Sequence, residues 1–236
     1  MDNAKTPMNE KLRFFLDVLF FGALWGLLEA TLGTLLHLPA FDKAGMYAAS
    51  TTIMVPLAYC LMANCYKRTG KLYCMPAMGV IAASIKMTVA FVVGFRPSVY
   101  NPAIYIIVES LAMMGAVAIF RPTKVLSLKT LAAVIVANTT YQFSYLLINM
   151  AMGGTNIFAS EKAWINVGEK YLFKFNCVAI LYMFGVGAIA YGIVKVLEAK
   201  HVEIKFDYKK IIYSPITAAV TFVLAVALTI TFAAVF

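Results

Sequence analysis

Seven long apolar stretches follow one another along this chain, and they constrain its fold more than any other feature. A helix that crosses the ~30 Å hydrocarbon core of a bilayer needs roughly 20 apolar residues at about 1.5 Å rise each. The stretches lie at about 14–37, 46–66, 75–94, 101–120, 125–150, 171–197 and 211–236. Within lipid, helices satisfy their own backbone hydrogen bonds. We therefore expect a single all-α integral membrane domain over 1–236, a bundle of about seven transmembrane helices.

Composition and charge support the same class. Of the 236 residues, 62% are hydrophobic and 13% are charged, whereas a soluble domain usually carries about 25% charged residues. In a soluble protein the net charge of +9 would suggest a nucleic-acid partner. Here the basic residues fall in short loops between apolar stretches, where they set topology and contact anionic lipid. We expect contact with the lipid bilayer and no nucleic-acid binding.

The distribution of lysine and arginine predicts the orientation, because cytoplasmic loops are enriched in these residues. Fourteen of them share one side: Lys5, Lys11, Arg13, Lys67, Arg68, Lys71, Arg121, Lys124, Lys129, Lys195, Lys200, Lys205, Lys209 and Lys210. Five share the other: Lys43, Arg96, Lys162, Lys170 and Lys174. The tail 1–13 and the basic loop 198–210 are therefore expected in the cytoplasm. With seven spans, the N-terminus is inside and the C-terminus outside.

The longest predicted outer loop is 151–170, and its aromatic and polar residues favour a lid. In this hypothesis Trp164 contacts a ligand, while His37, Arg96 and Asn156 act as gating residues. The alternative is a loop that lies among the lipid headgroups, with Trp164 as an interfacial anchor.

Three ionisable residues lie inside predicted spans: Glu29, Lys86 and Glu109. Each is eight residues from the outer end of its span, which places it about 12 Å deep at about 1.5 Å per residue. Charged groups at such positions cost about 2.5–3.5 kcal/mol on insertion scales and by default indicate function. The pattern predicts a buried cluster that binds a substrate. A structural Glu–Lys pair that fixes helix register is the alternative.

A polar stripe along 125–150 supports the substrate-binding interpretation. Its members recur at helical spacing on one face: Asn138, Gln142, Tyr145 and Asn149. Polar contacts between helices explain one or two such residues, whereas four in line are typical of a cavity wall. Asn176, near the outer end of 171–197, and Tyr105, one turn from Glu109, are expected to join the site.

The first span presents two different faces. Gly22, Gly26, Glu29, Gly33 and His37 share one, which we expect to point into the bundle because Glu29 should avoid lipid and glycine permits close approach of a neighbouring backbone. The second face is small and uncharged, and we expect it to pack against another helix, including one of another protein. It consists of Ala23, Leu27, Ala30 and Thr34.

Catalytic motifs are missing from the sequence. It contains no HExxH, no GxSxG and no Walker A motif. The chain therefore does not energise transport with ATP by itself. We expect neither an enzyme nor a metal site, and no cofactor.

Taken together, these features resemble the substrate-binding S components of energy-coupling factor (ECF) vitamin transporters. The resemblance covers about 12–197 and depends on four features. These are a compact chain with a cytoplasmic N-terminus, the small-residue face of the first span, outer loops after the first and fifth spans, and polar residues in the outer halves of spans four to six. Two features depart from the family: Leu27 occupies a small-residue position, and 211–236 adds a C-terminal helix to the six-helix core.

The resemblance implies a binding subunit in the bacterial plasma membrane for a vitamin or precursor. The ligand would be handed inward with a transmembrane coupling subunit and two cytoplasmic ATPases. The face of Ala23, Leu27, Ala30 and Thr34 would dock the coupling subunit. Aromatic side chains would stack on a planar ligand: Tyr100, Tyr105, Tyr141, Tyr145, Phe158 and Trp164.

Two other functions remain open at this point. One is a self-sufficient secondary transporter that couples to protons through Glu29 or Glu109, although no inverted repeat is visible. The other is an intramembrane enzyme for a lipid or isoprenoid, with Glu29, His37 and Glu109 as acid–base groups. The identity of the substrate does not follow from the sequence.

Overall fold

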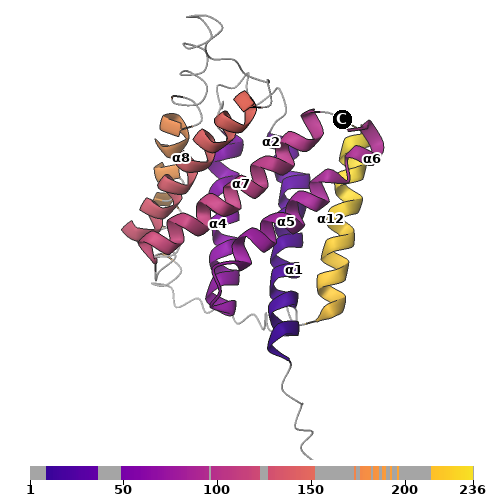
Figure 1. Ribbon diagram of the computed structural model, residues 1–236, viewed down its shortest axis with the longest axis horizontal. Helices are drawn as coiled ribbons and strands as arrows, with labels where there is room; N and C mark the ends of the chain where they lie inside the picture. Colours follow the sequence, from indigo (N-terminus) through magenta and orange to yellow (C-terminus); the bar gives the residue numbers. More distant parts are fainter. Residues whose placement is uncertain are drawn as a thin grey trace, which may run out of the picture.

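The computed structural model describes residues 9–36, 49–95, 97–122, 127–151 and 214–235, together with scattered residues between 173 and 196. The described chain consists of helices and short connections (Figure 1). In order these are α1 (Glu10–Leu28), a π-helical turn η1 (Glu29–Gly33), α2 (Thr34–Leu36), α4 (Ala49–Thr69), α5 (Cys74–Met87), α6 (Ala90–Val93), α7 (Pro97–Phe120), α8 (Leu128–Ala151) and α12 (Pro215–Val235).

Five segments of the described chain are long and apolar enough to cross a membrane: Glu10–Gly33, Cys74–Val93, Tyr100–Phe120, Leu128–Ala151 and Pro215–Ala234. An all-helical membrane bundle is therefore confirmed in this coarser form. Helix α4 forms where 46–66 is predicted to span, but threonines near its start and basic residues in its last turn make it less apolar. The predicted span 171–197 lies largely outside the described residues. The count of seven and the orientation stay predictions.

Local signals explain where several helices begin and end. The side chain of Asn9 accepts a hydrogen bond from the backbone N–H of Lys11 and caps α1. The Ser127 hydroxyl does the same for the N–H of Thr130 at the start of α8. Helix α4 ends at Gly70, whose φ of 67° lies in the left-handed region that favours glycine.

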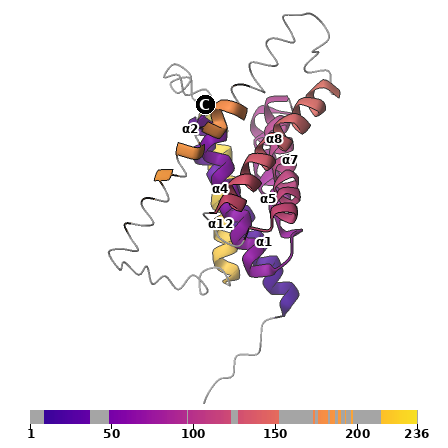
Figure 2. The same ribbon diagram turned by 90° about the vertical axis from the view of Figure 1, so that its left-hand side faces the viewer.

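The helices form a row of neighbours with one helix behind it. Helix α1 packs between α12 and α5, α5 packs against α7, and α7 packs against α8. Helix α4 contacts α1, α5 and α8. In Figure 2 the row appears as two groups, with α1, α4 and α12 on one side and α5, α7 and α8 on the other. The core between them is rich in methionine and contains the fully buried Trp25.

Glycines bring α5 close to its neighbours on both sides. A Cβ atom on Gly26 of α1 would stand 2.6 Å from Cδ1 of Ile85. A Cβ on Gly79 of α5 would collide with the side chain of Ser110 on α7. The expectation that Gly22 and Gly26 face the bundle is confirmed, because Gly22 likewise faces α5.

Helix α12 covers the small-residue face of α1. Ala23 and Ala225 are both fully buried and belong to one apolar cluster with Ile85. Leu27 packs against the same cluster, and Ala30 is buried. The predicted docking face is therefore occupied by a helix of the same chain. The side chain of Thr34, its fourth member, lies outside the described residues.

Large apolar side chains cover much of the outer surface. Phe91 is 88% exposed and Leu128 is 85% exposed. Helix α12 exposes Ile216, Val220 and Val223 on the side away from α1. Lipid is the solvent that suits such a surface, which agrees with a membrane-embedded protein.

Candidate functional site

A cavity of about 380 Å³ lies at the end of the bundle where α1 finishes. Thirteen of the described residues line it: Glu29, Gly33, Thr51, Met54, Val55, Lys86, Asn101, Pro102, Tyr105, Ile106, Glu109, Tyr141 and Gln142. This volume is near the lower end of the roughly 300–1,000 Å³ typical of ligand pockets.

The topology gathers these residues from five helices. They come from the C-terminal halves of α5, α8 and the helix formed by α1 and η1, from the N-terminal half of α4, and from the N-terminal half and middle of α7. Consecutive helices of this set therefore run in opposite directions past the cavity, as in an up-and-down bundle. This arrangement is why three charges at equal predicted depth meet although they are far apart in sequence.

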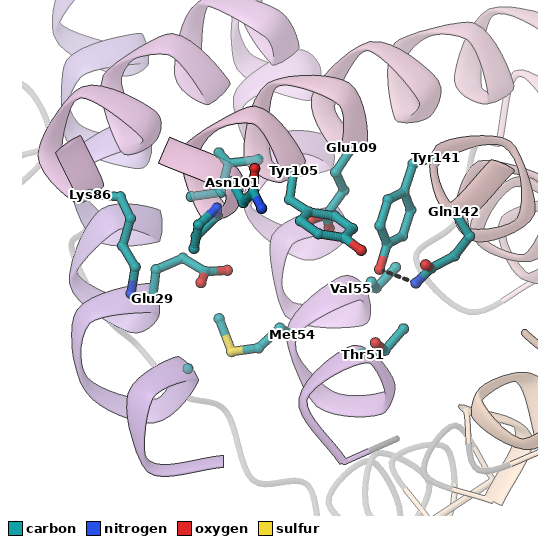
Figure 3. A pocket seen from close by; sticks show the side chains of 13 residues that line it. Glu29, Thr51, Met54, Val55, Lys86, Asn101, Tyr105, Glu109, Tyr141 and Gln142 are labelled. Atoms are coloured by element: carbon teal, nitrogen blue, oxygen red, sulfur yellow. Dashed lines mark hydrogen bonds between the residues drawn. The ribbon is translucent and has the colours of Figure 1, made fainter. Parts of the chain in front are cut away.

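The charged and polar groups lie at different ends of the cavity (Figure 3). Lys86 and Glu29 lie at one end, and Tyr141 and Gln142 lie at the other, next to Glu109. The ring of Tyr105 lies between the two ends. Met54 and Val55 of α4 line the side opposite this ring.

Glu29 begins the π-helical turn η1. Such turns are rare and occur often at functional sites. Its Oε2 atom lies 3.0 Å from the point where a Cβ on Gly33 would stand, so the missing side chain of Gly33 makes room for the carboxylate. Glu29 acts electrostatically on both Lys86 and Glu109. The three ionisable residues predicted to cluster therefore do so.

Two of the lining residues carry a buried oxygen without a hydrogen-bond partner among the described residues. Glu109 is 6% exposed, and its Oε1 has no hydrogen-bond partner among the described residues. Gln142 is 2% exposed, and its Nε2 donates to the hydroxyl of Tyr141 at 2.7 Å. The Oε1 of Gln142 is likewise unpartnered within the described part of the chain. Buried polar atoms are normally bonded, so both oxygens indicate a place for a donor from elsewhere.

Tyrosines form the wall between α7 and α8. The rings of Tyr105 and Tyr145 stack, and Tyr105 meets Tyr141 edge to face with ring centroids 6.0 Å apart. This aromatic group fixes the orientation of the Tyr105 ring along the cavity.

Five of the predicted substrate-binding residues line the cavity: Glu29, Lys86, Tyr105, Glu109 and Gln142. The rest of the polar stripe has other roles. Asn138 is fully buried and donates through Nδ2 to Oδ1 of Asn176 at 3.1 Å, joining α8 to the described part of 171–197. Tyr145 supports Tyr105 from behind. Asn149 is half-buried near the end of α8 and is not among the lining residues.

The predicted lid and gate lie outside the described residues. This applies to Trp164 and Asn156 in 151–170, and to His37 and Arg96. The basic loop 198–210 is also outside them.

The lining from α4 and part of that from α7 and α8 was not expected from the sequence. Asn101 is the first residue of a predicted span, and Thr51 lies within the predicted span 46–66 with no pattern that marks it as a site residue. Tyr141 was expected only as a stacking residue, yet its hydroxyl bonds to Gln142. Tyr141 is three residues after Asn138 and four before Tyr145, so helical spacing places it on the same face as the stripe and is the signal that could have included it.

A second buried charge was also missed, at the opposite end of the bundle. Asp17 of α1 is fully buried, and its Oδ1 accepts from Nε of Arg68 on α4 at 2.7 Å. The rule that identified Glu29 applies to Asp17 as well, because both lie inside the first predicted span.

Within the described residues, no group of three or more His, Cys, Asp or Glu side chains is arranged to hold a metal ion. The described residues that line the cavity include no serine, cysteine or histidine. Comparisons with family models, with curated proteins and with solved structures give no match.

Proposed function

We propose that this protein is a membrane-embedded binding subunit for the uptake of a small micronutrient, working with an ATP-driven coupling module. One observation carries the proposal: two residues that line the cavity, Glu109 and Gln142, each carry a buried oxygen that has no hydrogen-bond partner among the described residues. A bound molecule with donor groups would complete both.

The free-energy cost of burying Glu109 favours a binding role for the charged residues of the cavity over a purely structural role. A pair between Glu29 and Lys86 would account for those two residues as a device that fixes helix register. That pair does not account for Glu109, whose carboxyl is buried beside the cavity and whose Oε1 has no hydrogen-bond partner among the described residues. An unpaired buried carboxylate costs several kcal/mol, roughly, so a role for Glu109 in binding explains why it is present.

The coupling step rests on the resemblance to S components and needs a surface for the coupling subunit. The face expected for this contact is covered by α12, which packs on Ala23 and Leu27. A coupling subunit that used this face would first have to displace α12. The alternative is a docking surface elsewhere on the bundle.

The position of α12 favours a second candidate, a self-sufficient proton-coupled carrier. If α12 permanently fills the place of a partner helix, the chain needs no coupling subunit. Glu29 and Glu109 would then exchange protons within the cavity. Proteoliposomes that hold this chain alone distinguish the two. Uptake driven by a pH gradient without any ATPase supports the carrier, and absence of such uptake supports the binding subunit.

Native mass spectrometry of the purified protein tests the binding site itself. We expect a small molecule to co-purify at one copy per chain. The variants Glu109→Ala and Gln142→Ala should lose it, because each removes an acceptor that the ligand completes. Glu10→Ala is the matched control, since Glu10 is exposed at the other end of the bundle. If both cavity variants retain the ligand as well as this control does, the site lies elsewhere.

A further inference from the structure

We infer that the ligand is a compact, flat organic cation, such as an amine, an amidine or an amino-substituted heterocycle. Its N–H groups donate hydrogen bonds to Glu109 and Gln142. This inference rests on the proposed binding function and specifies the chemical class of ligand. Three independent features of the cavity support it: its acceptors, its charge and its shape.

The acceptors require a donor. At the end near Tyr141, the lining residues Glu109 and Gln142 each carry an Oε1 atom without a hydrogen-bond partner in the described chain. One N–H of the Gln142 amide donates to the Tyr141 hydroxyl. A ligand that carried only acceptors would place oxygen against oxygen there. A ligand with N–H groups would offer donors to both residues.

The charge favours a cation. Among the described residues of the lining, the acidic and basic groups are two carboxyls and one ammonium, from Glu29, Glu109 and Lys86. With all three ionised the lining carries one excess negative charge. A monocation neutralises it, whereas an anion doubles the imbalance in a medium of low dielectric constant. Glu29 lies at the Lys86 end, so the ammonium already has a carboxyl beside it.

The shape requires a flat body. The Tyr105 ring forms one side of the middle of the cavity, and Met54 and Val55 form the opposite side. Pro102 and Ile106 add apolar lining from α7. A delocalised cation gains further from the face of a tyrosine ring. The volume of about 380 Å³ suits a molecule with one or two rings.

Two isosteric probes test the inference on the full-length protein in detergent. Benzamidine is a planar cation with N–H donors, and benzoate has the same shape but is an anion with acceptors only. Calorimetric titration and thermal unfolding should both detect binding of benzamidine at millimolar concentration and little binding of benzoate. Glu109→Gln should lower the affinity for benzamidine at least tenfold, because the substitution removes the negative charge and keeps the shape of the side chain. Glu10→Gln, the same change at an exposed site, should leave benzamidine affinity unchanged.

The outcomes separate failure of this inference from failure of the proposed function. If benzoate binds more tightly than benzamidine and Glu109→Gln or Gln142→Leu alters its affinity, the cavity is a ligand site but the ligand class is wrong. If benzamidine binds wild type and both of these variants equally, its site is not this cavity. If neither probe binds at millimolar concentration, both the inference and the proposed cavity are contradicted. Gln142→Leu provides the test if Glu109→Gln does not fold.

Discussion

The protein buries a carboxyl group at each end of its bundle, and the two carboxyl groups differ in their partners. At one end the Asp17 carboxyl forms an ion pair within the chain with the Arg68 guanidinium, with Nε and Oδ1 2.7 Å apart, and its Oδ2 has no hydrogen-bond partner among the described residues. At the other end Glu109 lies on the wall of a cavity of about 380 Å³ with an oxygen that no described residue bonds. The cavity beside Asp17 is smaller, about 200 Å³.

This difference separates a structural charge from a functional one. Both carboxyls are almost fully buried, so burial alone does not distinguish them. The presence of an internal partner does. Where the chain supplies the partner, removal of the acid should cost stability. Where a ligand supplies it, removal should cost affinity and leave stability intact.

The largest effect is expected at the closed end. Asp17→Asn leaves the Arg68 guanidinium, whose side chain is 13% exposed, without its counter-charge. Removing one partner of a buried pair costs about 3–5 kcal/mol. Thermal unfolding in detergent should show a marked loss of stability.

A second ion pair at the same end provides the control for that change. Lys71 and Glu10 approach to 3.6 Å with both side chains exposed. Exposed pairs contribute little to stability, so Glu10→Gln should leave the unfolding temperature nearly unchanged. Equal effects of the two substitutions would show that the Asp17–Arg68 pair is no more important than a surface contact.

An intermediate effect is expected where α5 meets α7, because this contact holds Lys86 and Glu109 in one cavity. In Gly79→Ala the new methyl group collides with the Ser110 side chain. Overpacking of this kind costs about 1–3 kcal/mol. Ligand affinity should fall together with stability, since the two walls of the cavity are forced apart.

Gly115 on α7 is the matched control for Gly79. A Cβ atom there would meet no atom within 4 Å. In a helix interior, Gly→Ala gains about 0.5–1 kcal/mol, so Gly115→Ala should raise the unfolding temperature slightly and leave binding unchanged. A destabilised Gly115→Ala variant would show that substitution of any helical glycine, rather than the α5–α7 contact, causes the loss.

The smallest effect is expected at Asn138, which the structure places in an interhelical hydrogen bond with Asn176 rather than in the cavity lining. Such bonds within membranes contribute about 0.6 kcal/mol on average. Asn138→Leu should therefore lower the unfolding temperature slightly, and the calorimetric affinity for ligand should stay within about twofold. A large loss of affinity would instead make Asn138 part of the binding site.

Much of the fold follows from the sequence because length and apolarity determine a membrane helix almost alone. The long helices begin and end within a few residues of the predicted stretches, at caps such as Asn9 and Ser127. The meeting of Glu29, Lys86 and Glu109 was also predictable. Charged side chains at equal depth on neighbouring helices avoid lipid by facing one another inside the bundle.

Which side chains line the cavity depends on the rotation of each helix about its axis and on which helices pack against it. A polar stripe indicates that one face of α8 packs inside the bundle. It does not indicate that Asn138 bonds to Asn176 while Gln142 lines the cavity. The small face of α1 predicts a helical partner, and α12 turns out to be that partner. Apolar packing in lipid has no direction of its own, so the sequence left the choice between α12 and another protein open.

Retention of the co-purified ligand by Glu109→Gln tests the central claim most directly. Native mass spectrometry and thermal unfolding are measured together on wild type, Glu109→Gln and Asp17→Asn. The account predicts that Glu109→Gln carries no ligand and unfolds at or above the temperature of ligand-free wild type, since a bound ligand stabilises the folded state. It also predicts that folded Asp17→Asn is less stable but keeps the ligand. A Glu109→Gln protein that retains the ligand and loses stability as Asp17→Asn does would contradict the account, since Glu109 would then be a structural charge like Asp17.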